Sequence, residues 1–164
     1  MDVIIKRADG QTLSLSDYGI VARDFIVSSI PIISRYGTTD GRHGSIDYGA
    51  TYGTRTISVP FYYKSEDLHD FAIKRDTLFA MIGGLQSFYI SELRRDVYHT
   101  GDNITVNNRK YKVRLANEFA IEQTFRYGFG ELVFETTELP FAETDIVTTK
   151  YTANKFRLTY EGNV

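Results

Sequence analysis

The stretch TRTISVPFYYK, residues 54–64, alternates apolar and other side chains with a period of two. That period is typical of a β-strand with one buried face. The predicted inward face carries four apolar side chains: Ile57, Val59, Phe61 and Tyr63. Pro60 interrupts the middle of the strand. Because proline has no N–H to give to a sheet, we expect this strand to lie at an edge or to carry a bulge.

The next stretch, SEDLHDFAIKRDTLFAMIGG (65–84), has apolar residues spaced three and four apart, which is the period of an amphipathic α-helix. Ser65 suits the N-cap position, and the pair Gly83 and Gly84 suits the end of the helix. We therefore expect one helix over about residues 66–82, laid across a sheet. Its apolar side chains are Leu68, Phe71, Ala72, Leu78, Phe79 and Ile82.

Period-two patterns fill most of the remaining chain. Short strands are predicted in VIIKRA, GIVARDFIV, IPIISRY and QSFYIS. ITVNNRKYKVRL (104–115) reads as a hairpin that turns at Asn107 and Asn108, and residues 117–139 read as two strands with Gly128 and Gly130 between them. The predicted fold is therefore mainly β, an antiparallel β-sandwich with one α-helix. Its expected core residues are Ile57, Val59, Phe61, Leu68, Phe71, Phe79, Phe119, Ile121 and Phe134.

The composition excludes several kinds of site. The chain of 164 residues is long enough for one domain with its own core, and without cysteine it has no disulfide, thiol nucleophile or cysteine-ligated metal. Interspersed charges sum to −2, which argues against a specific nucleic-acid-binding face. No apolar run approaches the roughly 18 residues of a membrane span, and the N-terminus lacks a secretory pattern. We therefore expect a soluble protein with no membrane partner.

The stretch GSIDYGAT (44–51) has Gly44, Gly49 and Thr51 at the offsets of a phosphate-binding P-loop. Ala50 stands where the lysine that reaches the phosphates should be. A P-loop also needs the N-terminal amides and dipole of a following helix, whereas an alternating strand follows here. We therefore expect a glycine-rich loop that binds no nucleotide or other cofactor.

No other residues form a recognisable catalytic or metal site. The three histidines, His43, His69 and His99, lie on separate predicted elements and lack metal-ligand spacing. Glu131 and Glu135 alternate with apolar residues of a predicted strand, as on a solvent-facing edge. Motifs of hydrolases, metalloproteases and dinucleotide-binding enzymes are absent from the sequence. The sequence thus predicts that the protein is not an enzyme.

Six segments in a fixed order carry a family resemblance. They are RTISVPFYYK (55–64), KRDTLF (74–79), SFYISE (87–92), RKYKVRL (109–115), FAIEQTF (119–125) and ELVFETTELPFAET (131–144). In their order and spacing, they make residues 1–145 resemble the N-terminal domain of the distal tail proteins of siphophages that infect Gram-positive bacteria.

The resemblance implies a structural hub of the phage tail tip. In that family, six N-terminal β-sandwich domains with one helix each form a ring. One face of the ring meets the tail tube, the other meets the tail-associated baseplate protein, and the genome passes through the centre. The expected location is the virion, after synthesis in the cytoplasm of the host bacterium.

Full-length members of that family continue into a galectin-like domain that reaches the receptor-binding proteins. We therefore expect a hub domain over residues 1–145. Residues 146–164 are then expected to be a linker or the truncated start of the second domain.

The resemblance also implies a role for the glycine-rich stretch 37–53, as a long hairpin arm that reaches the neighbouring subunit. Its expected contact residues are Arg42, His43, Tyr48 and Tyr52. Tyrosine supplies rigid contact area, arginine supplies several hydrogen-bond donors, and the glycines let the arm bend. Without a partner, the same stretch would be a disordered surface loop.

A second class of function is left open by the aromatic content of 14%. An aromatic-rich β-sandwich can be a stand-alone carbohydrate-binding module that stacks exposed tyrosines on sugars. Such a module is expected to be a monomer that binds glycans, whereas the hub is expected to be a ring that binds proteins.

Overall fold

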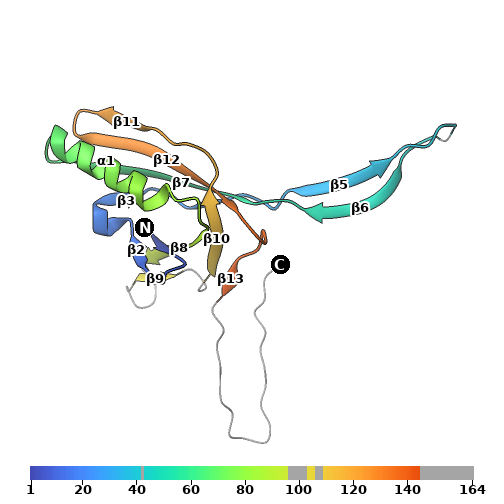
Figure 1. Cartoon of the computed structure of the whole chain (residues 1–164), viewed down its shortest axis with the longest axis horizontal. Coiled ribbons are helices and arrows are strands. Elements are labelled where there is room, and N and C mark those ends of the chain that lie inside the picture. Colours follow the sequence, from blue (N-terminus) through green and yellow to red (C-terminus); the bar gives the residue numbers. More distant parts are fainter. Residues whose placement is uncertain (42, 96–102, 106–108, 145–164) are drawn as a thin grey trace, which may run out of the picture.

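A computed structural model describes residues 1–41, 43–95, 103–105 and 109–144 of the chain. These residues form one α-helix, α1 (Leu68–Ile82), and one 3-10 helix, η1 (Ser16–Tyr18). The strands are β1 (Asp2–Lys6), β2 (Thr12–Ser14), β3 (Ile20–Ala22), β4 (Ile26–Val27), β5 (Ile32–Gly37), β6 (Ile46–Tyr52), β7 (Thr56–Lys64), β8 (Phe88–Arg95), β9 (Asn103–Thr105), β10 (Arg109–Leu115), β11 (Ile121–Thr124), β12 (Tyr127–Thr136) and β13 (Glu143–Thr144). The predicted mainly β, antiparallel fold with a single α-helix is confirmed over the described ranges (Figure 1).

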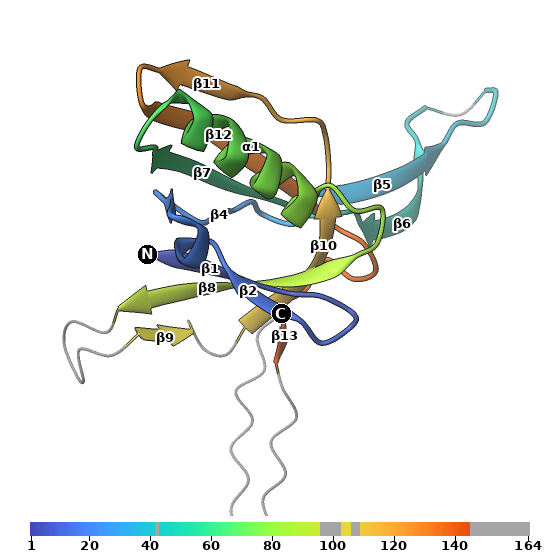
Figure 2. The same cartoon turned by 60° about the vertical axis from the view of Figure 1, so that its left-hand side comes forward.

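All strands except β5 and β6 belong to one antiparallel sheet with the order β2-β1-β8-β10-β12-β7-β3, to which β4, β9, β11 and β13 add at the sides. The sheet turns through β10, so that β1 and β8 form one limb and β7 and β12 form another (Figure 2). Helix α1 lies along the second limb. The two layers of the expected sandwich are thus two limbs of one continuous sheet.

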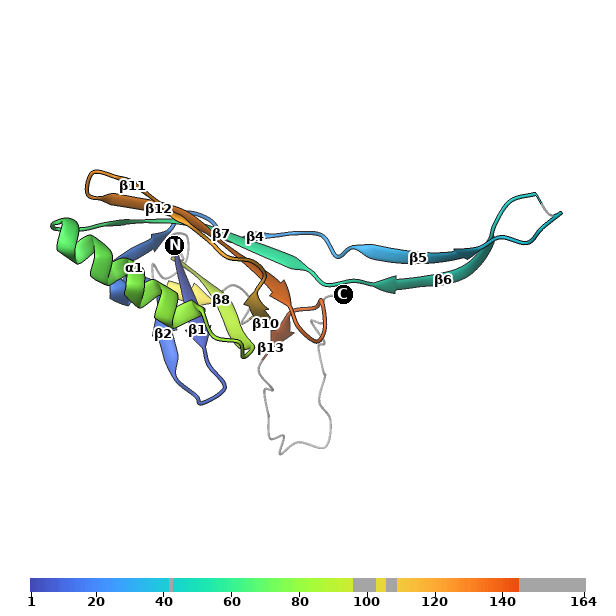
Figure 3. The same ribbon diagram turned by 45° about the horizontal axis from the view of Figure 1, so that its top comes forward.

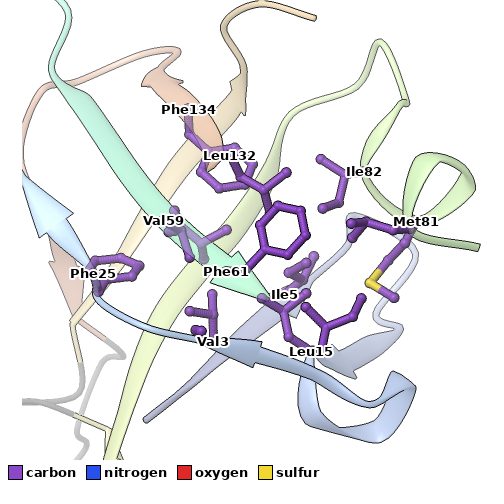
Figure 4. Packing of buried hydrophobic residues seen from close by; sticks show 14 of the residues in the cluster. Val3, Ile5, Leu15, Phe25, Val59, Phe61, Met81, Ile82, Leu132 and Phe134 are labelled. Carbon is purple, nitrogen blue, oxygen red and sulfur yellow. The ribbon is translucent and has the colours of Figure 1, made fainter. Parts of the chain in front are cut away.

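The core lies between the two limbs and α1 (Figure 4). Every member of the predicted inward face of β7 is at most 1% exposed, which confirms the period-two pattern of residues 57–63. Among the other expected core residues, Phe71 and Phe134 are buried, and Phe119 and Ile121 pack against the core while partly exposed. The largest fully buried side chains also include Ile5, Leu15, Ile20, Leu78, Ile82, Ile90 and Leu132.

Helix α1 begins two residues later than predicted because Asp67, not Ser65, is its N-cap. The Asp67 side chain accepts a hydrogen bond from the Asp70 N–H at 2.7 Å. The Ser65 hydroxyl is buried and instead donates to the Arg126 carbonyl at 2.9 Å. With this start, the buried face of the helix consists of Phe71, Leu78, Met81 and Ile82.

Two predicted core residues of the helix are therefore wrong. Leu68 is the first residue of α1 and is 68% exposed, so it lies outside the core. Phe79 is 38% exposed and reaches only the rim of the core, where its ring meets that of Phe119 at a centroid distance of 5.1 Å.

Pro60 lies in a central strand that shows no bulge, so the prediction of an edge position or a bulge is wrong. On one side β7 pairs with β12 in an unbroken register; on the other, β3 pairs with residues 61–63 and β4 with residues 57–58. The Pro60 carbonyl accepts a hydrogen bond from the Arg23 N–H at 2.8 Å, on the side of β3 and β4. The N and C=O of one residue in an antiparallel strand point the same way. The absent N–H thus falls in the gap between two short strands and removes no ladder bond.

The predicted pairings of residues 104–139 need two corrections. β9 and β10 both pair with β8 and not with each other, so 104–115 is not a hairpin of its own; its expected turn, residues 107–108, lies outside the described residues. Gly128 and Gly130 are part of β12, and the turn after β11 contains Phe125, whose φ is 56°. Both glycines lie opposite large core rings, Tyr63 and Phe61, which occupy the space that a larger side chain would need.

Candidate subunit-contact arm

Strands β5 and β6 form a two-stranded ribbon that extends away from the body of the domain (Figure 3). We call this ribbon, with the turn that joins its strands, the arm (residues 32–52). The residue pairs Ile32–Tyr52, Ile33–Thr51 and Ser34–Ala50 stand opposite each other near its base, and Tyr36–Asp47 and Gly37–Ile46 stand opposite each other nearer its tip. The arm is therefore a regular hairpin whose faces can be read from its register.

A β-bulge lies in the middle of the arm. The register shifts between Ser34 and Tyr36, so that Tyr48 and Gly49 of β6 together oppose Arg35 of β5. Gly49 has a φ of 91°, a conformation that side-chain-bearing residues rarely adopt, and its N–H donates to the Asp47 carboxylate at 2.8 Å. A bulge bends its strand and increases the local twist of the ribbon, so the arm is bent at this point.

Both faces of the arm expose large apolar side chains. Ile32, Tyr36 and Tyr52 share one face by the alternation of β5 and by the register. Tyr48 lies on the other face together with Ile33, because its ring occupies the space beside Gly37. Ile32 and Tyr48 are each 67% exposed and Tyr36 is 64% exposed. A ribbon that belongs to the surface of a monomer would instead carry polar side chains on at least one face.

The base of the arm is held firmly to the body. The Arg55 side chain donates to the Ser28 carbonyl at 2.6 Å, and its guanidinium lies 5.8 Å from the centre of the Tyr111 ring. The Arg55 N–H donates to the Thr136 hydroxyl at 2.9 Å. These contacts hold the chain on entry to β7, and therefore fix the direction in which the arm leaves the body.

The structure places the four predicted contact residues as follows. Tyr48 lies in the middle of the arm, and Tyr52 lies at its base, where its ring meets the edge of Phe141 at 5.7 Å. His43 is exposed in the turn at the tip, and Arg42 lies outside the described residues. The arm therefore brings Tyr48 and Tyr52 into one ribbon, but on opposite faces.

Three exposed residues of the arm were missed from the sequence: Ile32, Ile33 and Tyr36. Their segment, IPIISRY, has the composition of an ordinary core strand, so its composition gave no sign of exposure. The adjacent pair Ile32 and Ile33 was the available signal, because neighbours in a strand point to opposite faces.

Residues 46–52 form strand β6, so the predicted glycine-rich loop over 44–51 is wrong in its second part. Glycine is depleted in strands, but a bulge accommodates Gly49. β6 leads into β7 and not into a helix, so the stretch has none of the helix N-terminal amides that bind phosphate in a P-loop.

Away from the arm, a cavity of about 510 Å³ lies beside the C-terminal end of α1. Arg7 lines it, and its guanidinium donates to the Met81 carbonyl at 2.7 Å, so it caps the helix. His69 is exposed on α1, and His99 lies outside the described residues. Over the described ranges, the acidic and histidine side chains form no cluster that could hold a metal ion. No helix there has the length and apolar character needed to cross a membrane.

Comparison with known proteins agrees with the fold and with the sequence resemblance. Residues 8–136, which are most of the chain, match the family described as phage tail protein RIFT-related domain. The chain therefore belongs to this family of phage tail proteins, and is a structural component of the virion. No curated protein sequence matches it.

The structure is similar to the crystal structure of the SPP1 Dit (gp 19.1) protein, described as a paradigm of the hub adsorption apparatus in phages that infect Gram-positive bacteria. The TM-score is 0.60 at 15% sequence identity, over 84% of this chain and 49% of that protein. At this identity the likeness concerns the fold. The chain spans about half the length of the Dit protein.

Proposed function

We propose that the chain is the ring-forming hub of a phage tail tip, six copies of which join the tail tube to the tail-associated baseplate protein. The observation that carries the proposal is the arm, a ribbon that exposes apolar residues on both faces. Family membership and a fold shared with a hub protein support the same role.

The arm needs a partner for physical reasons. A two-stranded hairpin is only marginally stable in water without a third strand or a packed face. Holding its backbone in one conformation costs roughly 1–2 kcal/mol per residue, and this cost must be met by burial. Within the chain, burial of this kind is found near the base, where Tyr52 meets Phe141. A second copy can supply it for Ile32, Tyr36 and Tyr48.

A contact between an arm and a different surface of the next copy is heterologous, and such contacts close into a ring when the rotation between copies fits. The six-fold number, and the passage of the genome through the centre, rest on the family resemblance. The two faces of the ring would then be free for the tail tube and the baseplate protein. The hub has no catalytic step to perform, so we infer that the protein is not an enzyme and needs no cofactor.

The length of the Dit protein supports a two-part organisation. We infer that residues 1–145 are the hub domain and that residues 146–164 are a linker or the start of a second, galectin-like domain. Through such a domain the ring would carry receptor-binding proteins.

Sedimentation velocity over a range of protein concentrations tests the proposal. The wild-type chain is expected to assemble only at the higher concentrations. The ring is weaker in this experiment because the tube and baseplate partners that would clamp it are missing. The matched variant replaces residues 34–50 with Asn-Gly, a two-residue turn that joins the paired residues Ile33 and Thr51. It is expected to stay monomeric and to melt cooperatively. A wild type that is monomeric at every concentration would refute the ring and favour the carbohydrate-binding module.

A further inference from the structure

The outer surface of the β7 limb carries a row of aromatic side chains. Along β7, Phe61 and Tyr63 point into the core, so Tyr62 between them points outward. Tyr62 stands opposite Val21 of β3 on one side and opposite Phe129 of β12 on the other. Tyr127 continues the row along β12, with its ring 6.3 Å from that of Phe129. We call Val21, Tyr62, Tyr127 and Phe129 the aromatic face.

The aromatic face is partly exposed to solvent in the single chain, with Tyr62 half-buried at its centre. Val21 is 41% exposed, and Tyr127 and Phe129 are each 38% exposed. Helix α1 covers the opposite side of β7, where Phe71 packs on Tyr63, and so cannot shield this surface. Contiguous apolar side chains on the outside of a sheet mark a site of contact with another molecule.

Charged groups border the aromatic face. The Lys64 ammonium lies 5.8 Å from the centre of the Tyr127 ring, and Arg126 lies over the neighbouring ring of Phe125. Glu122 stands opposite Phe129 on β11 and is exposed. The surface therefore offers an apolar centre with two cations at the end of the limb and an acidic group at its side.

We propose that the aromatic face is the acceptor for the arm of a second copy of this chain. The proposal rests on the proposed function, in which the arm contacts a neighbour. The arm lays one of its faces on this surface. The face that carries Ile32 and Tyr36 matches the aromatic centre. The exposed Asp47, which stands opposite Tyr36 on the same face, and Asp40 at the tip match the cations Lys64 and Arg126. Rings flanked by complementary charges are typical of the centre and rim of protein interfaces.

The arm cannot reach the aromatic face of its own chain in this structure. β6 continues into β7 along one extended line, with the arm at one end and the aromatic face toward the other (Figure 3). Tyr48 and Tyr62 are 14 positions apart on this line. At ~3.3 Å per residue, this separates them by roughly 45 Å. One chain therefore presents two unlike surfaces at opposite ends, the arrangement that produces head-to-tail assembly.

A mixing experiment tests the proposal. The face variant carries Tyr62→Glu and Phe129→Glu, and keeps an intact arm. The arm variant has residues 34–50 replaced by Asn-Gly, and keeps an intact face. Each alone is expected to be monomeric. The two variants are mixed in equal amounts, well above the concentration at which the wild type assembles, and should give only heterodimers in native mass spectrometry. The arm of the face variant binds the face of the arm variant, and the pair then has no free arm and no free intact face.

Three controls make the result interpretable. Leu85→Glu places a glutamate at an exposed apolar position outside both surfaces, and should assemble as the wild type does. Cooperative melting is checked for every variant. If the face variant fails to fold, Tyr62→Ala with Phe129→Ala takes its place, since it removes the rings without adding charge.

Several results would overturn the proposal. A folded face variant that assembles like the wild type means that the arm docks elsewhere, although the ring itself then stands. A mixture that stays monomeric means that the two surfaces do not meet. A wild type that never assembles, and whose binding to a soluble polysaccharide is lost on Tyr62→Ala, means that the face stacks on sugars, and the proposed function fails with it.

Discussion

Replacing Phe71 with alanine tests how helix α1 is attached to the domain. Phe71 is 5% exposed, and its ring packs on the buried ring of Tyr63 at a centroid distance of 5.1 Å. Truncating a buried phenylalanine costs roughly 3–5 kcal/mol, through lost transfer free energy and the cavity left behind. This cost includes the loss of the ring contact with Tyr63, because an aromatic pair is worth about 0.5–1.5 kcal/mol. For a domain of this size, the expected fall in Tm is roughly 6–20 °C.

Two further substitutions on the same helix calibrate the result. Phe79→Ala should cost roughly 1–2 kcal/mol, because over a third of the side chain is already exposed and its ring contact is with Phe119. Leu68→Ala should change the free energy of unfolding by less than about 0.5 kcal/mol. The assay is urea unfolding followed by circular dichroism. A cost below about 1 kcal/mol for Phe71→Ala, or an equal cost for Leu68→Ala, would refute the packing described here.

The remaining predictions concern the sheet, the alkaline limit of stability and the domain boundary. Gly128→Ala would place a methyl group 2.6 Å from the Tyr63 ring and should cost roughly 1–3 kcal/mol in urea unfolding, whereas Gly84→Ala, with nothing within 4 Å, should be nearly neutral. Burial raises the pKa of Tyr63 from its ordinary value near 10 to about 12, so the folded state holds this proton more tightly. The protonated Tyr63 should therefore stabilise the fold below pH 10, and this stabilisation should be lost as the pH rises toward 12. The Tm of Tyr63→Phe should fall less than the Tm of the wild type between pH 10 and 12. An equal fall in both proteins would contradict the prediction. Truncation after Thr144 should leave a cooperative melt, and a collapsed product would show that residues 145–164 belong to the hub domain.

Features set by local periodicity could be predicted from the sequence. The inward face of β7 follows from apolar side chains two positions apart, and the existence of α1 follows from apolar side chains three and four positions apart. The start of α1 could not be predicted, because both Ser65 and Asp67 are good N-cap residues. What decides between them is the Arg126 carbonyl, 61 positions away, which engages the Ser65 hydroxyl.

Features set by pairing between distant segments escaped prediction. Pro60 is accommodated in a central strand because β3 and β4 leave a gap beside it. The arm was predicted as a glycine-rich hairpin because of the family resemblance, but its second strand, β6, was missed. Ile33 and Tyr36 look like core residues in the sequence, because β-branched and aromatic residues favour strands, whether the strand is buried in the core or exposed as in the arm.

The mass of the native particle tests the central claim most directly. Native mass spectrometry of the wild-type chain, recorded over increasing concentration, should give a species near 112 kDa, six times the 18.7 kDa chain. The variant in which Asn-Gly replaces residues 34–50 should give only the mass of one chain while it keeps the β-sheet circular dichroism spectrum of the wild type. A wild type that remains a single chain throughout, or an armless variant that still forms the six-chain species, would contradict assembly through the arm.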